Sequence, residues 1–234
     1  MITPDFVDTL SGIDTNMLLA LNGVHASFWD YFMSAFTQKF IWIPMYAAIL
    51  YVLLLNFHWK AVICYVIAIA LIITFADQLC AHVIRPLVMR LRPSNTNCPI
   101  AHLVHIVGGY RGGAYGFPSS HAGNSFGLAL FVAYLFRKHL LVFFIFFWAL
   151  VNCYTRIYLG VHYPGDLLVG LLIGAFFGWL FTYIVHKLLV RYLEPHVKHL
   201  RRPEMKHQLA PVYVGTLTIG CIAIYAGVSS LGWI

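Results

Sequence analysis

The sequence predicts an all-α membrane protein: a polytopic helix bundle of about six transmembrane helices, preceded by helices that lie in the membrane interface. Two features of its composition indicate this fold, since 61% of the 234 residues are hydrophobic and only 10% are charged. Soluble globular domains hold roughly 45–50% apolar residues. The third indication is that the apolar residues fall in runs of about 20, long enough to cross a bilayer. Because the connections are short, residues 1–234 are expected to form a single membrane domain.

The first 34 residues differ from the rest of the chain. In residues 1–34, large apolar side chains are interspersed with Asp14, Asn16, His25 and Asp30. Such a mixture favours one or two short amphipathic helices that lie in the membrane interface.

Six apolar runs follow, at 36–57, 61–82, 120–136, 140–155, 166–186 and 209–233. The second run could continue as a helix to Arg92, because Pro93 marks a break there. Pro86 could instead kink this helix or end it earlier. The long connection 93–117 is rich in glycine. It could bind phosphate through backbone amides, act as a flexible lid, or form plain turns.

Lysines and arginines near the spans predict the orientation in the membrane. The connections 58–60, 137–139 and 187–208 share one face and carry Lys60, Arg137, Lys138, Lys187, Arg191, Lys198, Arg201, Arg202 and Lys206. Loops rich in these residues stay in the cytoplasm. We therefore predict a basic cytoplasmic loop at 187–208, with the N-terminus, the glycine-rich connection and residues 156–166 on the opposite face. The net charge of +7 then fits anionic membrane lipids and argues against a nucleic acid.

Two arginines near the second run are candidates for binding phosphate. Arg85 and Arg92 are seven residues apart, so on an unbroken helix they would lie on nearly the same face. Arg90 would fall on a different face. Two guanidiniums directed at one point form a strong phosphate site. Alternatively, the pair could anchor the end of the helix to lipid headgroups.

Two further motifs begin later helices. In Pro118-Ser119-Ser120-His121, the serines would cap a helix whose free amides favour an anion, and His121 would face that anion. A simple capped helix is the alternative interpretation. In the second motif, which starts at Arg156, Asp166 follows His162 by four residues and could accept a hydrogen bond from one imidazole nitrogen. A purely structural His–Asp pair is the alternative there.

Together these groups fit phosphoryl transfer. The arginines would neutralise a phosphate and stabilise its transition state. A histidine oriented by a carboxylate could attack phosphorus, while the second histidine protonates the departing oxygen. The catalytic candidates are His162, His121 and Asp166, and the phosphate-binding candidates are Arg85, Arg92, Arg156, Ser119 and Ser120. No set of residues has metal-ligand spacing, so we predict neither a metal nor another cofactor.

The motifs of residues 85–166 resemble the three signatures of the type 2 phosphatidic acid phosphatase superfamily, which are Lys-x6-Arg-Pro, Pro-Ser-Gly-His and Ser-Arg-x5-His-x3-Asp. This chain differs at three positions: Arg85 replaces lysine, Ser120 replaces glycine and Thr155 replaces serine. The first change keeps the positive charge and the third keeps the hydroxyl. Ser120 adds a side chain where the backbone is expected to approach phosphate.

The resemblance implies an all-helical, metal-independent lipid phosphatase. It assigns His162 as the nucleophile that forms a phosphohistidine, Asp166 as the group that orients it, and His121 as the general acid that later helps to activate water. Members with six spans are bacterial inner-membrane enzymes whose active site faces the periplasm. Their substrates include undecaprenyl diphosphate, phosphatidylglycerophosphate, phosphatidic acid and lipid A phosphates.

Two other functions remain open. The chain could be a non-catalytic protein that binds or transports a lipid phosphate, with the arginines holding the headgroup. It could also resemble the vanadate-dependent haloperoxidases, which share the motifs but are soluble. The pairing of His162 with Asp166 favours catalysis, because a headgroup clamp does not need an oriented nucleophile. No obligate protein partner is evident from the sequence.

Overall fold

A computed structural model of the chain describes residues 4–197, 199–201 and 204–232. Within these residues the regular structure is helical, and β-pairing is limited to two isolated bridges. The predicted all-α bundle is therefore confirmed. Lys198 and Arg202, which were used to predict the orientation, lie outside the described residues.

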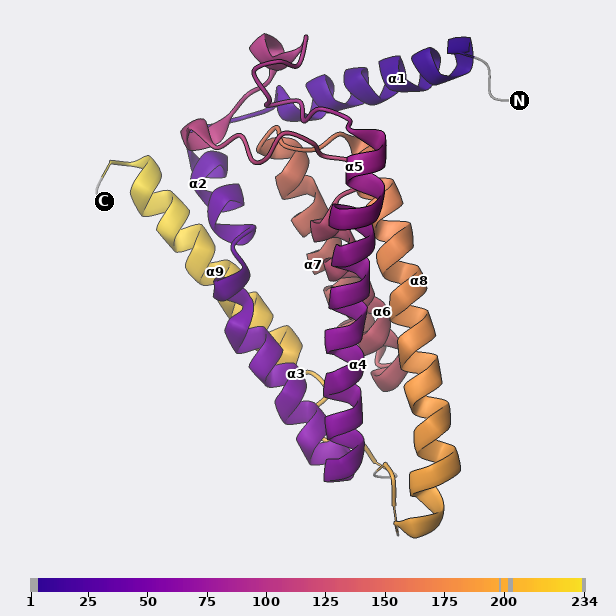
Figure 1. Cartoon of the computed structure of the whole chain (residues 1–234). Helices are drawn as coiled ribbons and strands as arrows, with labels where there is room; N and C mark the ends of the chain where they lie inside the picture. Colours follow the sequence, from indigo (N-terminus) through magenta and orange to yellow (C-terminus); the bar gives the residue numbers. More distant parts are fainter. Residues whose placement is uncertain (1–3, 198, 202–203, 233–234) are drawn as a thin grey trace.

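The two N-terminal helices have different positions. Helix α1 (Pro4–Asn22) lies across one end of the bundle (Figure 1). Helix α2 (Ser27–Phe36) departs from the expected interfacial position, because it turns into the bundle and packs against α9 and α7. A short 3-10 helix, Lys39–Trp42, then leads into α3 (Ile43–Asn56).

The remaining elements are the long helices of the bundle and short helical turns. They are α4 (Trp59–Gln78), a π turn (Leu79–Ile84), α5 (Arg85–Val88), two 3-10 turns (Ala101–Leu103 and Val107–Gly109), α6 (Ser120–Phe136), α7 (His139–Tyr158), α8 (Pro164–Leu188), a second π turn (Leu189–Leu193), a 3-10 turn (Glu194–His196) and α9 (Ala210–Ser230). Both ends of the chain lie toward the end of the bundle that carries α1, which an even number of crossings requires (Figure 1).

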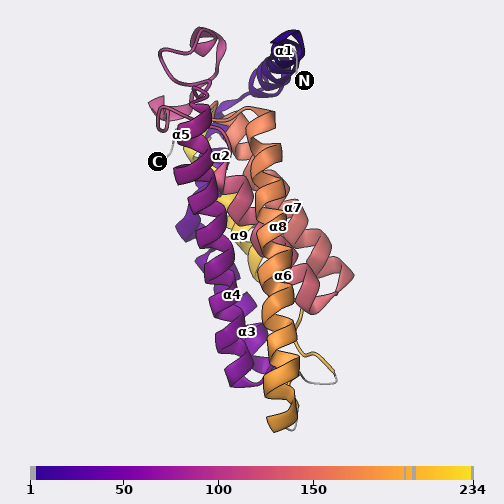
Figure 2. The same ribbon diagram turned by 45° about the vertical axis from the view of Figure 1, so that its right-hand side comes forward.

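Among the described residues, five helical segments are long and apolar enough to cross a membrane: Lys39–Asn56, Trp59–Val88, His139–Tyr158, Pro164–His196 and Ala210–Ser230. The sixth predicted span is α6, whose 17 residues are at the short end of the spanning range. This helix lies inside the bundle, in contact with α4, α7 and α8 (Figure 2). Because its neighbours cover it, most of its side chains are buried.

The most extensive helix contact in the bundle joins α6 to α8. Three glycines of α8, at every fourth residue, face the backbone of α6: Gly170, Gly174 and Gly178. A Cβ atom on Gly174 would overlap the carbonyl oxygen of Gly123, and one on Gly178 would lie 2.7 Å from that of Gly127. Small residues of this kind let two membrane helices approach closely. We call this contact the glycine seam; it fixes the start of α6 relative to the start of α8.

The helix that begins with α4 ends before Arg92. It passes through the π turn, continues for one turn over Arg85–Val88, and ends at Met89 in the left-handed conformation with φ 50°. Pro86 has no N–H to continue the bonding of the preceding turn. The chain then reverses, and the Arg92 amide donates to the Ala114 carbonyl at 3.0 Å. The expectation that Arg85 and Arg92 could share one helix face is therefore wrong.

Helix α8 is longer than the predicted span 166–186. Together with its terminal turns it covers 33 residues, Pro164–His196. That corresponds to about 50 Å at 1.5 Å per residue, against a hydrocarbon core of roughly 30 Å. The helix extends past the connection between α6 and α7 (Figure 1). The segment is therefore longer than a span requires, and Lys187 and Arg191, the first part of the predicted basic loop, lie in its last turns.

Candidate active site

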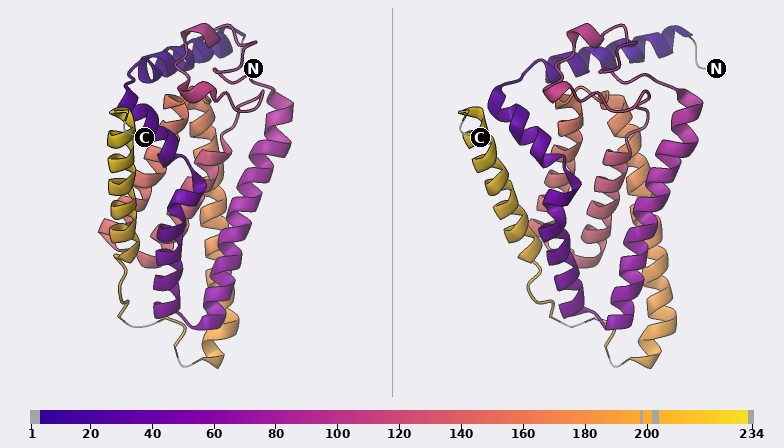
Figure 3. Two further views of the ribbon diagram at one scale, coloured as in Figure 1. Left: turned by 90° about the vertical axis from the view of Figure 1, so that its left-hand side faces the viewer. Right: turned by 60° about the vertical axis from the view of Figure 1, so that its left-hand side comes forward.

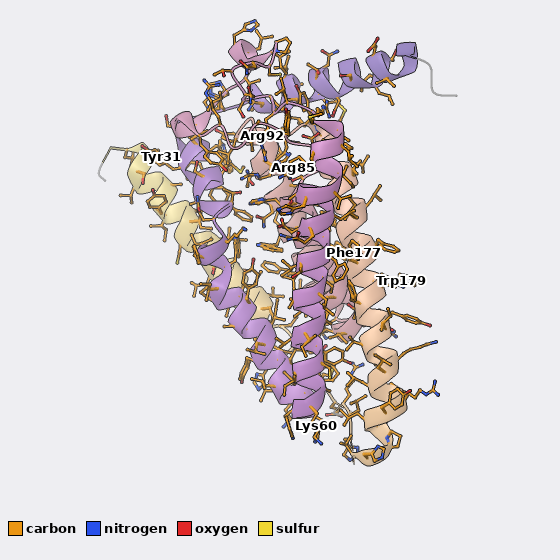
Figure 4. The ribbon with its side chains drawn as sticks, viewed as in Figure 1. Tyr31, Lys60, Arg85, Arg92, Phe177 and Trp179 are labelled. Atoms are coloured by element: carbon orange, nitrogen blue, oxygen red, sulfur yellow. The ribbon has the colours of Figure 1, made fainter. Side chains whose placement is uncertain are left out.

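The predicted site residues come together at the end of the bundle that carries α1. They lie on α5, on the connection after it, at the starts of α6 and α8, and in the last turn of α7. The turned views show these segments meeting beneath the long connection between α5 and α6 (Figure 3). Arg85 and Arg92 lie close to each other at this end, whereas Lys60 marks the opposite end of α4 (Figure 4).

At the centre of the site is the His162–Asp166 pair. The two residues are fully or almost fully buried, and His162 Nδ1 lies 3.3 Å from Asp166 Oδ2. The same carboxylate oxygen accepts the backbone N–H of Tyr163 at 3.1 Å. This local bond places the carboxylate in the first turn of α8, beside the imidazole that it contacts.

Arg92 lies on the other side of the imidazole. Its Nη1 atom is 2.8 Å from His162 Nε2 and donates to the Val161 carbonyl at 2.8 Å. A guanidinium is always a donor, so Nε2 must be the acceptor and the proton of the neutral ring is assigned to Nδ1, facing Asp166. The Nε2 lone pair therefore points toward a phosphate-binding group.

The buried arginines also set the protonation of this end of the site. Burial, followed by the positive charges of Arg92, Arg156 and Arg85, holds the pKa of His162 well below 6.5. The imidazole is therefore neutral at pH 7, as a nucleophile must be. Burial and the charges of Arg85 and Arg156 lower the pKa of Arg92 to about 10, so Arg92 keeps its charge at pH 7.

Ser119 and Ser120 start α6 but have different roles. Ser119 is the N-cap, whose hydroxyl accepts the Ala122 N–H at 3.5 Å. Its own amide donates to the Asp166 carbonyl at 2.9 Å and so joins α6 to α8. The amides that remain for an anion are those of Ser120 and His121, because the Ala122 and Gly123 amides both donate to Ser119. The Ser120 hydroxyl accepts from Arg85 Nη2 at 3.4 Å.

The three arginines share an unusual feature. Arg85 also donates to the Pro118 carbonyl at 3.0 Å, and Arg156 donates to the Thr37 hydroxyl at 2.9 Å. In the described part of the chain, however, the Nε atoms of Arg85, Arg92 and Arg156 are buried without a hydrogen-bond partner. An unpaired buried donor costs about 1–3 kcal/mol. Each of the three guanidiniums therefore has a donor that an anion could satisfy.

Two cavities meet at His121, in the first turn of α6. The first, of about 480 Å³, is the more polar of the two and is lined in part by Arg156, Lys39 and Tyr110. The second, of about 380 Å³, runs between α3, α4, α6 and α7 and is lined by Thr37, Lys39, Trp42, Tyr46, Ile49, Ile69, Ile73, His121, Asn124, Ser125, Leu128, Trp148 and Asn152. We call them the polar cavity and the apolar cavity. His121 thus lies where a polar group and a hydrocarbon chain of one ligand would join.

The glycine-rich connection covers the His162–Asp166 pair. A Cβ atom on Gly116 would lie 3.0 Å from Asp166 Oδ2 and 3.5 Å from His162 Nδ1. Gly112, with φ 69°, packs against the Arg92 side chain in the same way. Both glycines are needed for close approach of the backbone, which the sequence pattern alone did not indicate.

The sequence analysis also missed two charged residues. Arg90 was placed on a different helix face, yet its Nη1 atom lies 3.0 Å from Asp166 Oδ1. Asp14 of α1 lies 2.7 Å from the same Arg90 atom. The scarcity of charge could have indicated both, because the chain has only eight acidic residues. No group of three or more His, Cys, Asp or Glu side chains in the described ranges is placed to hold a metal ion.

A membrane helix bundle in which two buried arginines and the half-buried Arg85 surround a His–Asp pair defines a class of membrane phosphatases. The family model of the PAP2 superfamily matches residues 59–189 of this chain. The chain therefore belongs to the PAP2 superfamily, and it is a membrane lipid phosphatase.

Two relatives and one solved structure carry the comparison further. The chain is 58% identical over 224 residues to a lipid A 4'-phosphatase of Bacteroides thetaiotaomicron, covering 96% of this chain and 100% of the relative. It is 34% identical over 174 residues to a lipid A 4'-phosphatase of Porphyromonas gingivalis, covering 74% and 73% of the two chains. The crystal structure of Aquifex aeolicus LpxE has the same fold, with a TM-score of 0.55, 23% identity, and coverage of 72% of this chain and 94% of that one.

Proposed function

We propose that this enzyme removes the 4'-phosphate of lipid A through a phosphohistidine formed on His162. The observation that supports a phosphate ligand is the set of three buried, unpaired Nε donors of Arg85, Arg92 and Arg156. Four lipid phosphates were left open by the sequence. Of these, lipid A is favoured because a relative that is 58% identical over its whole length carries that activity in its name.

The geometry supports a two-step displacement. In the first step His162 Nε2 attacks phosphorus, the bond from phosphorus to the ester oxygen breaks, and His121, which is protonated once the anionic phosphate is bound, gives that oxygen a proton. Arg92, 2.8 Å from Nε2 before substrate binds, transfers its hydrogen bond to a phosphate oxygen. In the second step a water, deprotonated by His121, attacks the phosphohistidine and releases inorganic phosphate. Asp166 stabilises the charge that His162 carries between the steps.

The apolar cavity fits the lipid part of the substrate. It begins at His121 and continues between α3 and α4. Two buried polar atoms on its wall have no partner in the described structure, the acceptor Asn124 Oδ1 and the donor Trp148 Nε1. An amide linkage at the head of an acyl chain could pair with both, because it has one donor and one acceptor, whereas an ester could only accept from Trp148. Lys39 lines both cavities and would lie beside the polar headgroup.

The enzyme is proposed to lie in the inner membrane with this site facing the periplasm. The basic residues Lys60, Arg137 and Lys187 lie at or toward the opposite end of the bundle, which is the pattern of a cytoplasmic face. The buried Cys98 is unsuitable for a labelling test. Gly113 is exposed and open to a side chain. A membrane-impermeant thiol reagent should therefore label G113C from the periplasm, above the wild-type background; labelling only after the cytoplasm is exposed would invert the orientation.

The substrate is tested with purified protein and a panel of lipid phosphates. Release of phosphate should be fastest from the 4' position of lipid A, compared with its 1 position, undecaprenyl diphosphate, phosphatidylglycerophosphate and phosphatidic acid. Faster release from any other member of the panel would overturn the proposed substrate. Turnover should persist in excess EDTA, since the proposed steps use only side chains of the chain; loss of activity on chelation would contradict this.

The mechanism is tested with His162→Ala. Release of phosphate should fall to background, at least about 10⁴-fold, because no nucleophile remains. Brief reaction with labelled substrate should leave acid-labile phosphate on the wild-type protein and none on the variant. A variant that still turns over, with a normal unfolding temperature, would remove His162 from the proposed role.

A further inference from the structure

A chain of ionic contacts joins the first helix to the catalytic pair. Arg90 Nη1 donates to Asp14 Oδ2 of α1 at 2.7 Å and to Asp166 Oδ1 of α8 at 3.0 Å. The other oxygen of Asp166 is the one that lies 3.3 Å from His162 Nδ1. One guanidinium therefore bridges a carboxylate of α1 and the carboxylate that faces the imidazole.

Asp14 holds the start of α8 by a second contact. Its Oδ1 atom accepts the backbone N–H of Gly165 at 2.7 Å. Gly165 directly precedes Asp166, and a Cβ atom there would lie only 2.7 Å from Asp14 Oδ2. A carboxylate at a helix N-terminus is also favoured by the helix dipole. Asp14 thus fixes the backbone next to Asp166 as well as the arginine that neutralises it.

Arg90 is held between its partners. The guanidinium carbon lies 3.7 Å from the centroid of the Tyr163 ring, in a cation–π contact. The side chains of Arg90 and Asp14 are 24% and 15% exposed, whereas that of Asp166 is 0% exposed. A carboxylate buried this completely needs a paired cation to stay charged. Arg90 provides that cation from the rim of the site, and neither Arg90 nor Asp14 lines the two cavities formed by the described residues.

Helix α1 is docked by one face. Asp14, Leu18 and Asn22 are spaced by four residues and lie along that face. Leu18 is fully buried, and Asn22 Nδ2 donates to the carbonyl of Tyr158 at 2.8 Å. An adjoining face exposes a stripe of large apolar side chains, which are Val7, Leu10, Ile13, Met17 and Leu21. The helix is therefore fixed to the protein through Asp14 while the adjoining face is free to enter the membrane interface.

We infer that Asp14 and Arg90 are positioning residues for His162 and Asp166, and that α1 is for this reason part of the active site. The inference rests on the proposed role of His162 as the nucleophile. Arg90 keeps Asp166 ionised and in place, so that Nδ1 keeps its proton and Nε2 faces phosphorus. Asp14 determines where Arg90 lies. Neither side chain touches the substrate.

The inference predicts a specific pattern in three variants. Arg90→Gln removes the cation beside Asp166 and should lower kcat about 100-fold, since a displacement of about 1 Å has an effect of that size. Asp14→Asn keeps an acceptor for Gly165 but frees Arg90, and should lower kcat on the order of 10-fold. In both, KM should change less than about twofold, because the phosphate-binding arginines are intact. Arg90→Lys should recover part of the activity lost in Arg90→Gln.

The double variant Asp14→Asn/Arg90→Gln distinguishes a positioning role from an unspecific loss of structure. If Asp14 acts through Arg90, the double variant should be no slower than Arg90→Gln alone. Asp8→Asn is the matched control, because it removes the same charge from an exposed position of α1. Its kcat should equal that of the wild type. Turnover is expressed per folded protein, measured by size-exclusion chromatography in detergent.

Two substrates separate this inference from the proposed function. Each variant is assayed with lipid A and with p-nitrophenyl phosphate, which tests the chemistry without a lipid. Low kcat in the Asp14 and Arg90 variants with p-nitrophenyl phosphate supports the inference even if lipid A is not the substrate. Wild-type kcat in both variants overturns the inference even if lipid A is hydrolysed. Multiplicative losses in the double variant, or losses confined to KM, also overturn it.

Discussion

The two sides of α6 are packed in opposite ways. Toward α8, the glycine seam brings the backbones so close that a Cβ atom on Gly174 would overlap the Gly123 carbonyl. Toward α3 and α4, the apolar cavity of about 380 Å³ remains, and these two helices diverge toward the end that carries the site (Figure 3). His121 and the His162–Asp166 pair are fixed through the close-packed side. The proposed catalytic groups thus lie on a close-packed contact, whereas the neighbouring side of α6 keeps a cavity, which is where we propose that the lipid binds.

The largest expected effect comes from breaking the glycine seam. Gly174→Leu would force α8 away from α6, and overpacking of this kind costs about 3 kcal/mol or more. We expect a much lower unfolding temperature and at least a tenfold loss of phosphatase activity. Gly220→Leu in α9 is the control, because a Cβ atom at Gly220 meets nothing within 4 Å. Equal stability of the two variants, measured by thermal unfolding in detergent, would show that the seam does not hold the bundle.

A smaller effect is expected from a large side chain that fills the apolar cavity. Ile73 lines the apolar cavity from α4, so Ile73→Trp should obstruct a hydrocarbon chain. KM for the lipid substrate should rise about tenfold, a loss of roughly 1.4 kcal/mol in binding. Turnover of p-nitrophenyl phosphate should not change, because the phosphate site is intact. The control is Ile67→Trp, an exposed position of α4 outside this cavity. If Ile73→Trp and Ile67→Trp have the same KM for the lipid substrate, the apolar cavity is not the site that binds the lipid.

The smallest expected effect is a pH dependence of the free energy of unfolding, which results from the burial of His162. Because the pKa of His162 is held well below 6.5 in the folded protein, the unfolded chain binds more protons below that pH. The free energy of unfolding should therefore fall as the pH falls, by about 1 kcal/mol between pH 6.5 and 5.5. His162→Gln lacks this contribution and should show a smaller decrease in unfolding temperature. Parallel curves for the two proteins would mean that the imidazole is open to water.

Much of the architecture could be predicted because the sequences of membrane proteins contain clear patterns, such as long apolar runs. Long apolar runs located the helices of the bundle, and motifs with fixed spacing selected eight candidate site residues that lie at one end of it. The predictions that were wrong concern local backbone conformation and the position of one helix. Nothing in the sequence around Met89 indicates its left-handed conformation. The helical pattern therefore predicts that Arg90 lies on a face away from the site. Helix α2 was expected in the interface because its length and composition do not reveal that α9 covers it.

The contacts that the sequence could not indicate join distant segments. Asp14 and Arg90 are 76 residues apart, as are Arg90 and Asp166. Gly116 lies against His162 only because the segment after Arg90 pairs with the segment before Phe117, through the bond from the Gly116 amide to the Arg90 carbonyl at 2.9 Å. Pairings of this kind depend on how a long connection folds back, and periodicity carries no information about that.

The π turn at Leu79–Ile84 has a consequence for how Arg85 is aimed. A turn closed by i→i+5 bonds holds one residue more than an α turn, so everything beyond it is rotated by about 100° relative to an uninterrupted α-helix. Arg85 follows immediately and reaches Pro118 across the bundle. An uninterrupted α-helix of the same length would therefore aim the guanidinium away from Pro118, whereas an α-helix one residue shorter would aim it as the π turn does. For this part of the enzyme, the number of residues before Arg85 is as decisive as their chemistry.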